Sequence, residues 1–213
     1  MEKTQDYINT LISKQKFGDK AMEEYAKECY IPIVKKDTAN MLRVLIATKQ
    51  PKKILEIGTA IGYSAKIMLS AYEQSHLTSL EIDYDRFEMA KKNLKKYANR
   101  VTLELCDAGD YLLNCEEKFD FIFLDGAKGH YLSYLQSLLN VMADNAILVA
   151  DNVLQDGMTA GEKQTKQKNQ STVAKMQKFL EELCKSKELV TTILPIGDGL
   201  SISVLKAKEK ENL

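Results

Sequence analysis

Three oxygen-bearing side chains follow apolar segments in the second half of the chain, in an arrangement that could hold a metal ion. Asp125 ends the run FDFIFLD, and Asp151 and Asn152 end the run ILVADN. A carboxylate at the end of a buried strand is costly unless its charge is paired or bound to a cation. Two carboxylates and one amide oxygen form a hard-oxygen ligand set that suits Mg²⁺. Two independent strand-end caps are the alternative, and we favour the metal because all three residues should converge on one rim of a parallel sheet.

A glycine-containing turn at residues 53–64, KILEIGTAIGYS, could bind a cofactor. Glycine lets the backbone approach a ligand closely, and the helix that follows would present unpaired N–H groups. The spacing is not the dinucleotide pattern G-x-G-x-x-G, because position 60 is Ala60 and the next glycine is Gly62. Glu56 and Gly58 complete the pattern E-x-G-x-x-x-G, which resembles the S-adenosylmethionine (SAM) loop of class I methyltransferases. An ordinary strand-to-helix turn is the alternative.

Further acidic residues follow two other predicted strands. Glu81 ends the second strand about twenty residues beyond the glycine turn, where a carboxylate can accept both hydroxyls of a ribose. Asp83 is a rival for that role, and a solvated strand-end acid is the alternative for Glu81. Asp107 and Ala108 follow the third strand, where they could contact an adenine ring, although aspartate after a strand is also common in turns.

Lys128 follows Asp125 by three residues, so its amine can reach the same rim. Near a bound divalent cation a lysine loses its proton more easily, so Lys128 could act as a base or as an electrostatic guide. The alternative is a lysine at the start of a helix that faces solvent. We expect His130 to be structural or to lie at the edge of the pocket.

The elements that position these residues alternate between strands and helices from residue 53 onward. Apolar runs predict strands at 54–57, 77–82, 101–105, 119–124 and 147–150, and helical patterns lie between them, as at 86–97 and 131–142. Two further β-type runs, 189–194 and 200–205, flank the turn PIGDG and predict a hairpin. The fold class is therefore α/β, a doubly wound and mostly parallel sheet of seven strands with an antiparallel C-terminal hairpin.

Residues 1–50 predict extra helices ahead of this sheet. Ile8, Leu11 and Ile12 share one helical face, and Asp37 could cap the helix that follows it. We expect a single domain over 1–213, with 1–50 as a helical cap and 51–213 as the core. We expect the polar residues 154–170 to form a mobile loop.

Composition narrows the function classes. The chain of 213 residues has 30 Lys plus Arg and 30 Asp plus Glu, so nucleic acid or an anionic membrane could bind only at a local patch. No apolar run has the length of a signal or a membrane span, so we expect a cytoplasmic protein that binds no membrane. The four cysteines are scattered, with no C-x-x-C, which predicts reduced and packed thiols in place of disulfides or a zinc site. The two histidines exclude a histidine-rich metal site.

Five segments together resemble the metal-dependent O-methyltransferase family that includes the catechol and caffeoyl-CoA enzymes. They are ILEIGTAIGYS (54–64), SLEID (79–83), FDFIFLDGAKGHY (119–131), ADNVL (150–154) and GDGL (197–200). The resemblance implies a Rossmann-like sheet, a homodimer, and SAM and Mg²⁺ (or another hard divalent cation) as cofactors. The SAM-binding residues that it implies are Val34, Glu56, Gly58, Ser64, Glu81, Asp107, Ala108 and Asp125. It also implies Asp125, Asp151 and Asn152 as metal ligands, and Asp125 and Lys128 as catalytic residues with Lys128 as the proton acceptor.

Within this family, IPIVKK (31–36) and LPIGDGLSIS (194–203) are most similar to the bacterial branch that methylates wobble 5-hydroxyuridine in tRNA. That branch carries an arginine-rich run after ADNVL, whereas this chain has lysines, which lack the bidentate phosphate fork of arginine. The lysines that would contact the anticodon loop are Lys163, Lys166, Lys168 and Lys175. A solvated, lysine-bearing helix start is the alternative. The resemblance thus implies Mg²⁺-dependent methyl transfer from SAM to 5-hydroxyuridine, giving 5-methoxyuridine.

The metal site alone does not choose the methyl acceptor, because a catechol and 5-hydroxyuridine both offer two adjacent oxygens. An O-methyltransferase of small catechol-like phenols, or of their CoA esters, is therefore the alternative function. A nicotinamide-dependent oxidoreductase fits the α/β alternation but not the glycine spacing. A SAM-binding module without activity would leave the three metal ligands without a purpose.

Overall fold

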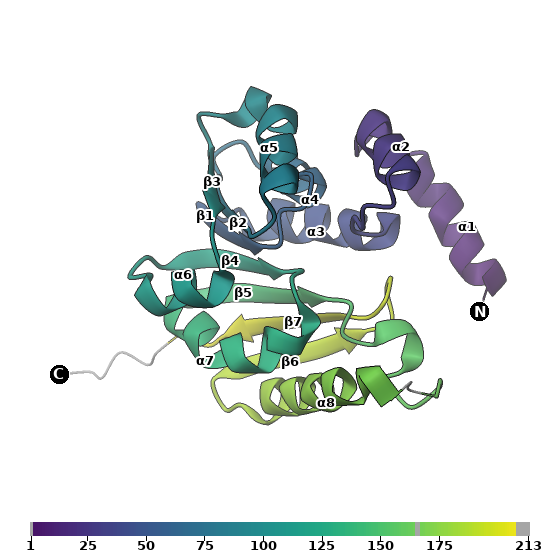
Figure 1. Ribbon diagram of the computed structural model, residues 1–213, viewed down its shortest axis with the longest axis vertical. Helices are drawn as coiled ribbons and strands as arrows, with labels where there is room; N and C mark the ends of the chain where they lie inside the picture. The colour runs from purple at the N-terminus through teal and green to yellow at the C-terminus, as the bar shows by residue number, and fades with distance from the viewer. Residues whose placement is uncertain (1, 165–166, 208–213) are drawn as a thin grey trace.

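The computed structural model describes residues 2–164 and 167–207, which form a seven-stranded sheet between two layers of helices (Figure 1). The strands are β1 (Lys53–Ile57), β2 (His76–Glu81), β3 (Val101–Leu105), β4 (Phe119–Leu124), β5 (Met142–Asp151), β6 (Leu189–Leu194) and β7 (Leu200–Leu205). Their order in the sheet is β3-β2-β1-β4-β5-β7-β6. The first five strands pair in parallel, and β7 lies antiparallel between β5 and β6. The predicted fold class is confirmed.

Helices cover both faces of the sheet because the strands carry apolar side chains on both faces. The α-helices are α1 (Glu2–Ser13), α2 (Lys20–Glu28), α3 (Lys36–Lys49), α4 (Tyr63–Ala71), α5 (Tyr84–Asn93), α6 (Ala108–Asn114), α7 (Tyr131–Val141) and α8 (Gln170–Lys185). Figure 1 shows α3, α4 and α5 over one face and α6, α7 and α8 over the other. In β4, Phe121 and Phe123 belong to the buried cluster of α3 and α4, whereas Ile122 belongs to the cluster of α7 and α8.

The two N-terminal helices lie apart from the sheet, beside one end of α3 (Figure 1). Of the predicted apolar face of α1, only Ile12 is buried, and Ile8 and Leu11 are exposed. The prediction that Asp37 caps α3 was wrong. The helix begins at Lys36, so Asp37 lies inside its first turn and Lys35 occupies the cap position. The Asp37 carboxylate instead accepts a hydrogen bond from the backbone N–H of Gly197, at 3.0 Å, in the turn before β7.

Two acidic side chains set the boundaries of β2 and α5. The strand ends at Glu81, one residue before the predicted end, because the Glu81 carboxylate accepts hydrogen bonds from the N–H groups of Ile82 (3.0 Å) and Asp83 (2.9 Å) and turns the chain. Helix α5 begins at Tyr84, two residues before the predicted start, because Asp83 caps it through the N–H of Arg86 at 2.9 Å. A separate 3₁₀ turn, Lys95–Tyr97, completes the predicted helical segment.

The described part of the predicted loop 154–170 contains short 3₁₀ turns, and the strand before this loop is longer than predicted. Strand β5 extends from Met142 to Asp151, well beyond the predicted 147–150, because its first residue already pairs with Phe119 of β4. Short 3₁₀ turns follow at Gln155–Gly157 and Gln167–Asn169, and another, Lys128–His130, precedes α7. Helix α7 ends at Val141, one residue before the predicted end.

All four cysteines are free, but the prediction that they are packed was wrong for Cys29 and Cys184, which are exposed. Among the helices in the described part of the chain, none combines the length and the apolar character that a bilayer crossing requires.

Candidate active site

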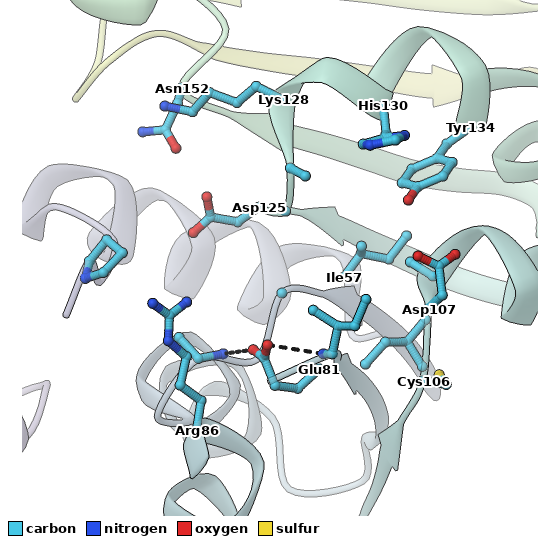
Figure 2. A pocket seen from close by; sticks show the side chains of 18 residues that line it. Ile57, Glu81, Arg86, Cys106, Asp107, Asp125, Lys128, His130, Tyr134 and Asn152 are labelled. Carbon is cyan, nitrogen blue, oxygen red and sulfur yellow. Dashed lines mark hydrogen bonds between the residues drawn. The ribbon is translucent and has the colours of Figure 1, made fainter. Parts of the chain in front are cut away.

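A cavity of about 520 Å³ opens where the winding of the sheet reverses, at the carboxyl ends of β1 and β4. Ligands of doubly wound sheets bind at such a reversal point. The predicted residues that line the cavity are Gly58, Glu81, Asp107, Ala108, Asp125, Lys128 and Asn152. Figure 2 shows Lys128 and Asn152 near one end of this cavity, Asp107 toward the other end, and Asp125 and Glu81 between them. The structure therefore brings together side chains that are up to 94 positions apart, from Gly58 to Asn152.

Gly58 lets the ends of β1 and β4 approach each other closely. Its φ is +101°, and a Cβ atom there would lie 2.2 Å from the carbonyl oxygen of Asp125. The backbone N–H of Asp125 donates to the carbonyl of Ile57 at 2.9 Å. Only glycine fits this position, and the close approach places Asp125 beside the glycine turn.

The Glu81 carboxylate holds the glycine turn while it faces the cavity. One of its oxygens accepts a hydrogen bond from the N–H of Ala60 at 2.7 Å. The other accepts the N–H groups of Ile82 and Asp83, and Glu81 is only 6% exposed. Asp83, the rival for the ribose role, is engaged as the cap of α5 and does not line the cavity.

The opposite end of the cavity is formed by the start of α6 and by α7. Asp107 caps α6 by accepting hydrogen bonds from the N–H groups of Gly109 (2.7 Å) and Asp110 (3.2 Å). His130 stacks on Tyr134 with ring centroids 5.6 Å apart, and both rings line the cavity (Figure 2). His130 thus lies at the pocket edge, one of the two positions expected for it.

Four other predicted residues lie behind the cavity wall. Val34, Glu56, Ser64 and Asp151 are buried and do not line it. The Glu56 carboxyl accepts hydrogen bonds from the hydroxyls of Ser64 and Ser79. Burial raises the pKa of Glu56 to about 7, the two hydroxyls oppose that rise, and the charge of Glu81 adds to it. The hydrogen bond between Ser64 and Glu56 therefore links the two ends of the glycine turn on its buried side.

Glu56 therefore makes stability depend on pH. Its pKa is about 7 in the folded chain and 4.5 in the unfolded one, so its contribution is full below about pH 4.5 and is lost as the pH rises through 7. We expect wild-type protein to lose on the order of 3 kcal/mol of unfolding free energy over this window, and Glu56→Gln to lose much less. Urea unfolding at pH 5 and pH 8 measures the difference, with exposed Glu73→Gln as the control. Equal losses in wild type and Glu56→Gln would remove Glu56 as the cause.

The rim at Asp125 carries unfavourable negative charge. Burial raises the pKa of Asp125 well above its usual range, the charges of Asp151 and Glu56 add to the rise, and Lys128 opposes it. Burial also raises the pKa of Asp151 to about 6; the N–H of Asn152 lowers it, and the charge of Asp198 raises it. Two buried carboxylates that are costly to ionise together are stabilised when a divalent cation binds between them.

The donor atoms at this rim fit a hard divalent cation. Within the described residues, no cluster of three or more Cys, His, Asp or Glu side chains offers a metal site, so a cation here also requires the amide oxygen of Asn152. Asn152 has a left-handed backbone with φ of 58°, and its side chain lies near the Lys128 amine in Figure 2. Two carboxylates and an amide are the oxygen ligands that Mg²⁺ and similar ions accept.

The comparison with known proteins now identifies the family. A sequence profile of O-methyltransferases matches residues 15–206, which is most of the chain. The chain belongs to the O-methyltransferase family. The catechol O-methyltransferase of Niastella koreensis is 29% identical and the alignment covers 96% of this chain and 97% of that protein. A candidate caffeoyl-CoA O-methyltransferase of Arabidopsis thaliana is 26% identical over 88% of this chain and 80% of its own length.

The fold agrees with this family. The crystal structure of a candidate caffeoyl-CoA O-methyltransferase from Staphylococcus aureus has a TM-score of 0.86 and 31% identity, and the match covers 95% of this chain and 99% of that one. These relatives are of the catechol and caffeoyl-CoA type. Their likeness does not distinguish a tRNA-modifying branch of the O-methyltransferase family.

Arg86 and Pro32 are among the residues that line the cavity of this O-methyltransferase but were not predicted. Arg86 of α5 points its guanidinium into the cavity (Figure 2) and forms no ion pair with the described residues. Its position five residues after Glu81, near the start of the helix that leaves β2, was the available signal. Pro32 comes from the segment before α3, and no local pattern indicates that this segment reaches the rim.

The predicted tRNA-contacting lysines are only partly covered by the structure. Lys163 and Lys175 are exposed. Lys166 lies outside the described residues, and so does the side chain of Lys168. The exposed pair is compatible with an external anionic partner and equally with a solvated surface.

Proposed function

We propose that this protein transfers a methyl group from SAM to a hydroxyl oxygen that has a second oxygen beside it. The observation that carries the proposal is that the glycine turn, Asp125 and Asn152 line one cavity, while the charge of Asp151, behind its wall, acts on Asp125. The glycine turn suits a cofactor with a polar end, and the three oxygen-bearing side chains suit a cation that would position the acceptor. Membership of the O-methyltransferase family supports the reaction type.

The wall of the cavity supplies the groups that SAM would need. SAM supplies an electrophilic methyl group when it is bound. Glu81 would accept hydrogen bonds from the ribose hydroxyls, since its carboxylate borders the cavity while the turn holds it in place. The backbone at Gly58 would approach the methionine portion, and Asp107 and Ala108 would border the adenine.

The opposite rim would hold the acceptor. Asp125, Asp151 and Asn152 would bind Mg²⁺ or another hard divalent cation, which when bound favours the deprotonated form of a hydroxyl and fixes its position. The amine of Lys128 extends along the same rim, where it would take up the hydroxyl proton or offset the negative charge of the acceptor.

Two acceptors share the required pair of oxygens. A small catechol-like phenol, or its CoA ester, is supported by the likeness to catechol and caffeoyl-CoA enzymes over nearly the whole chain. Wobble 5-hydroxyuridine in tRNA is supported by the segments 31–36 and 194–203 and by the exposed Lys163 and Lys175.

Methyl transfer from labelled SAM tests the proposal directly. The acceptors are catechol, caffeoyl-CoA, and tRNA that contains 5-hydroxyuridine, each with Mg²⁺ and with EDTA. We expect EDTA-sensitive transfer to at least one of them. Activity that persists in EDTA would remove the metal from the proposal, and the absence of SAM binding by calorimetry would overturn it. Transfer to catechol but not to tRNA would reject the tRNA acceptor.

A further inference from the structure

A second cavity is separate from the candidate active site. It lies where the segment 14–19, which joins α1 to α2, meets α3, α4 and the 3₁₀ turn Lys95–Tyr97. Its volume is about 310 Å³, which is enough for a small ligand. No residue lines both this cavity and the larger one. A molecule bound here would therefore be distinct from SAM and from the methyl acceptor.

The lining of this second cavity carries an excess of positive charge. Its cationic side chains are Lys16, Arg43 and Lys66, and its single acid is Asp19. Lys66 forms an ion pair with Asp19, and the hydrogen bond from Lys66 lowers the pKa of that carboxyl, so the pair is charged and balanced near neutral pH. Lys16 and Arg43 form no ion pair within the described residues. Two positive charges are therefore left to attract an anion.

Arg43 is already oriented for such an anion. Its side chain is half-buried, and its guanidinium lies over the ring of Phe17, 4.4 Å from the ring centre. One of its nitrogens, Nη2, donates a hydrogen bond to the side-chain oxygen of Gln15. A guanidinium has five N–H donors, so others remain for a ligand. The planar group matches the oxygens of a phosphate, and a group that is held in place loses little freedom on binding.

Aromatic side chains form much of the remaining wall. Tyr97 is half-buried and packs against the buried cluster of α3 and α4. Tyr63 is only 3% exposed, and its hydroxyl donates to the Glu23 carboxylate at 2.6 Å. Gly18, with φ of +84°, lies so close that a Cβ atom there would be 2.9 Å from this hydroxyl. These contacts hold the segment before α2 against α4, and they leave fixed rings that a flat ligand can pack against.

We propose that this cavity is a second ligand site, for a small compound that joins a phosphate group to an aromatic or heterocyclic ring. Arg43 and Lys16 would bind the phosphate, whose charge of nearly −2 matches the two unpaired cations. The ring would lie against Tyr97. Because α4 begins at Tyr63, directly after Gly62, the ligand would contact the helix that follows the glycine turn. The inference does not depend on the proposed methyl transfer, since the two cavities have separate linings.

Calorimetry of the full-length protein with phenyl phosphate tests the proposal. Inorganic phosphate supplies the anion alone and phenol the ring alone, and every titration is repeated in excess SAM so that the larger cavity is occupied. Arg43→Gln removes the charge, Arg43→Lys keeps the charge without the planar fork, and Tyr97→Leu removes the ring. Lys16→Gln changes an exposed side chain, so it tests the site without disturbing the fold. Lys14→Gln is the control, because Lys14 is exposed on the same segment but does not line the cavity.

We expect wild-type protein to bind phenyl phosphate at least about tenfold more tightly than phosphate or phenol, with or without SAM. Arg43→Gln should raise the Kd at least about tenfold, and Arg43→Lys should raise it less. Lys16→Gln and Tyr97→Leu should each raise it about threefold, and Lys14→Gln should leave it within about twofold.

Three results would overturn the inference. They are the absence of phenyl phosphate binding to wild-type protein, a Kd that is the same in wild type, Arg43→Gln and Lys16→Gln, and a Kd for phenol as low as that for phenyl phosphate. Thermal unfolding of each variant shows whether the fold is kept. If Arg43→Gln does not fold, Lys16→Gln and Arg43→Lys decide the outcome, because both retain a positive charge beside Phe17.

Discussion

Replacing Asp151 with asparagine is expected to reduce Mg²⁺-dependent methyl transfer by roughly 1000-fold, which corresponds to about 4 kcal/mol of transition-state stabilisation. Asp151 is 2% exposed, and it ends β5 at the same rim as Asp125. The amide keeps the size of the carboxyl group but removes the charge that a divalent cation requires. Because Asp151 does not line the cavity that contains Glu81 and Gly58, the Kd for SAM should change little.

The same substitution should stabilise the protein when no metal is present. The pKa of Asp151 is about 6 in the folded chain and 3.8 in the unfolded one, so its contribution is full below about pH 3.8 and is lost as the pH rises through 6. At pH 8 the ionised group therefore costs on the order of 2–3 kcal/mol, and Asp151→Asn should raise the Tm in EDTA by several degrees.

Radiolabelled methyl transfer and thermal unfolding in EDTA and in Mg²⁺ measure the two effects together. Asp144→Asn is the matched control, since Asp144 is an exposed acid on the same strand. Full activity of Asp151→Asn would remove Asp151 from the metal site. A lower Tm of Asp151→Asn in EDTA would show that the Asp151 charge does not destabilise the metal-free protein.

Gly58→Ala is expected to destabilise the fold by about 3 kcal/mol or more and to abolish measurable SAM binding. The added Cβ would lie 2.2 Å from the carbonyl oxygen and 2.8 Å from the carbonyl carbon of Asp125, neither of which can move without shifting β4. Relief of that clash must separate the glycine turn from Asp125, so the cofactor wall and the metal rim are disturbed together.

Gly161→Ala is the control for backbone strain alone. Gly161 also has a left-handed φ, +77°, but no heavy atom lies within 4 Å of the Cβ position. It should therefore cost only about 1 kcal/mol, the cost of a left-handed non-glycine residue. Urea unfolding and calorimetry with SAM compare the two variants. Equal destabilisation would mean that the Asp125 carbonyl is not what requires glycine at position 58.

Local patterns were sufficient for the sheet and for much of the rim. The apolar runs at 101–105, 119–124, 189–194 and 200–205 are strands with the predicted bounds, because a short apolar run between turn residues encodes a strand locally. Some errors lie at ends that a single side chain controls, whereas the early start of β5 depends on its pairing with β4. Because Asp83 caps α5, this helix begins earlier than predicted. Strand β2 ends at Glu81 because its carboxylate accepts hydrogen bonds from the backbone N–H groups of the next two residues.

The sequence by itself determined which acids meet, because the carboxyl ends of parallel strands share one edge wherever the strands lie. Gly58, Glu81, Asp125 and Asn152 could therefore be placed together without coordinates. Only the tertiary structure decided which buried residues pack against these four residues and which side chains surround the cavity. The burial of Glu56 and Ser64, the contact of Asp37 with Gly197, and the stacking of Arg43 on Phe17 depend on segments far apart in the chain. No local pattern encodes those neighbours, because packing between elements creates them.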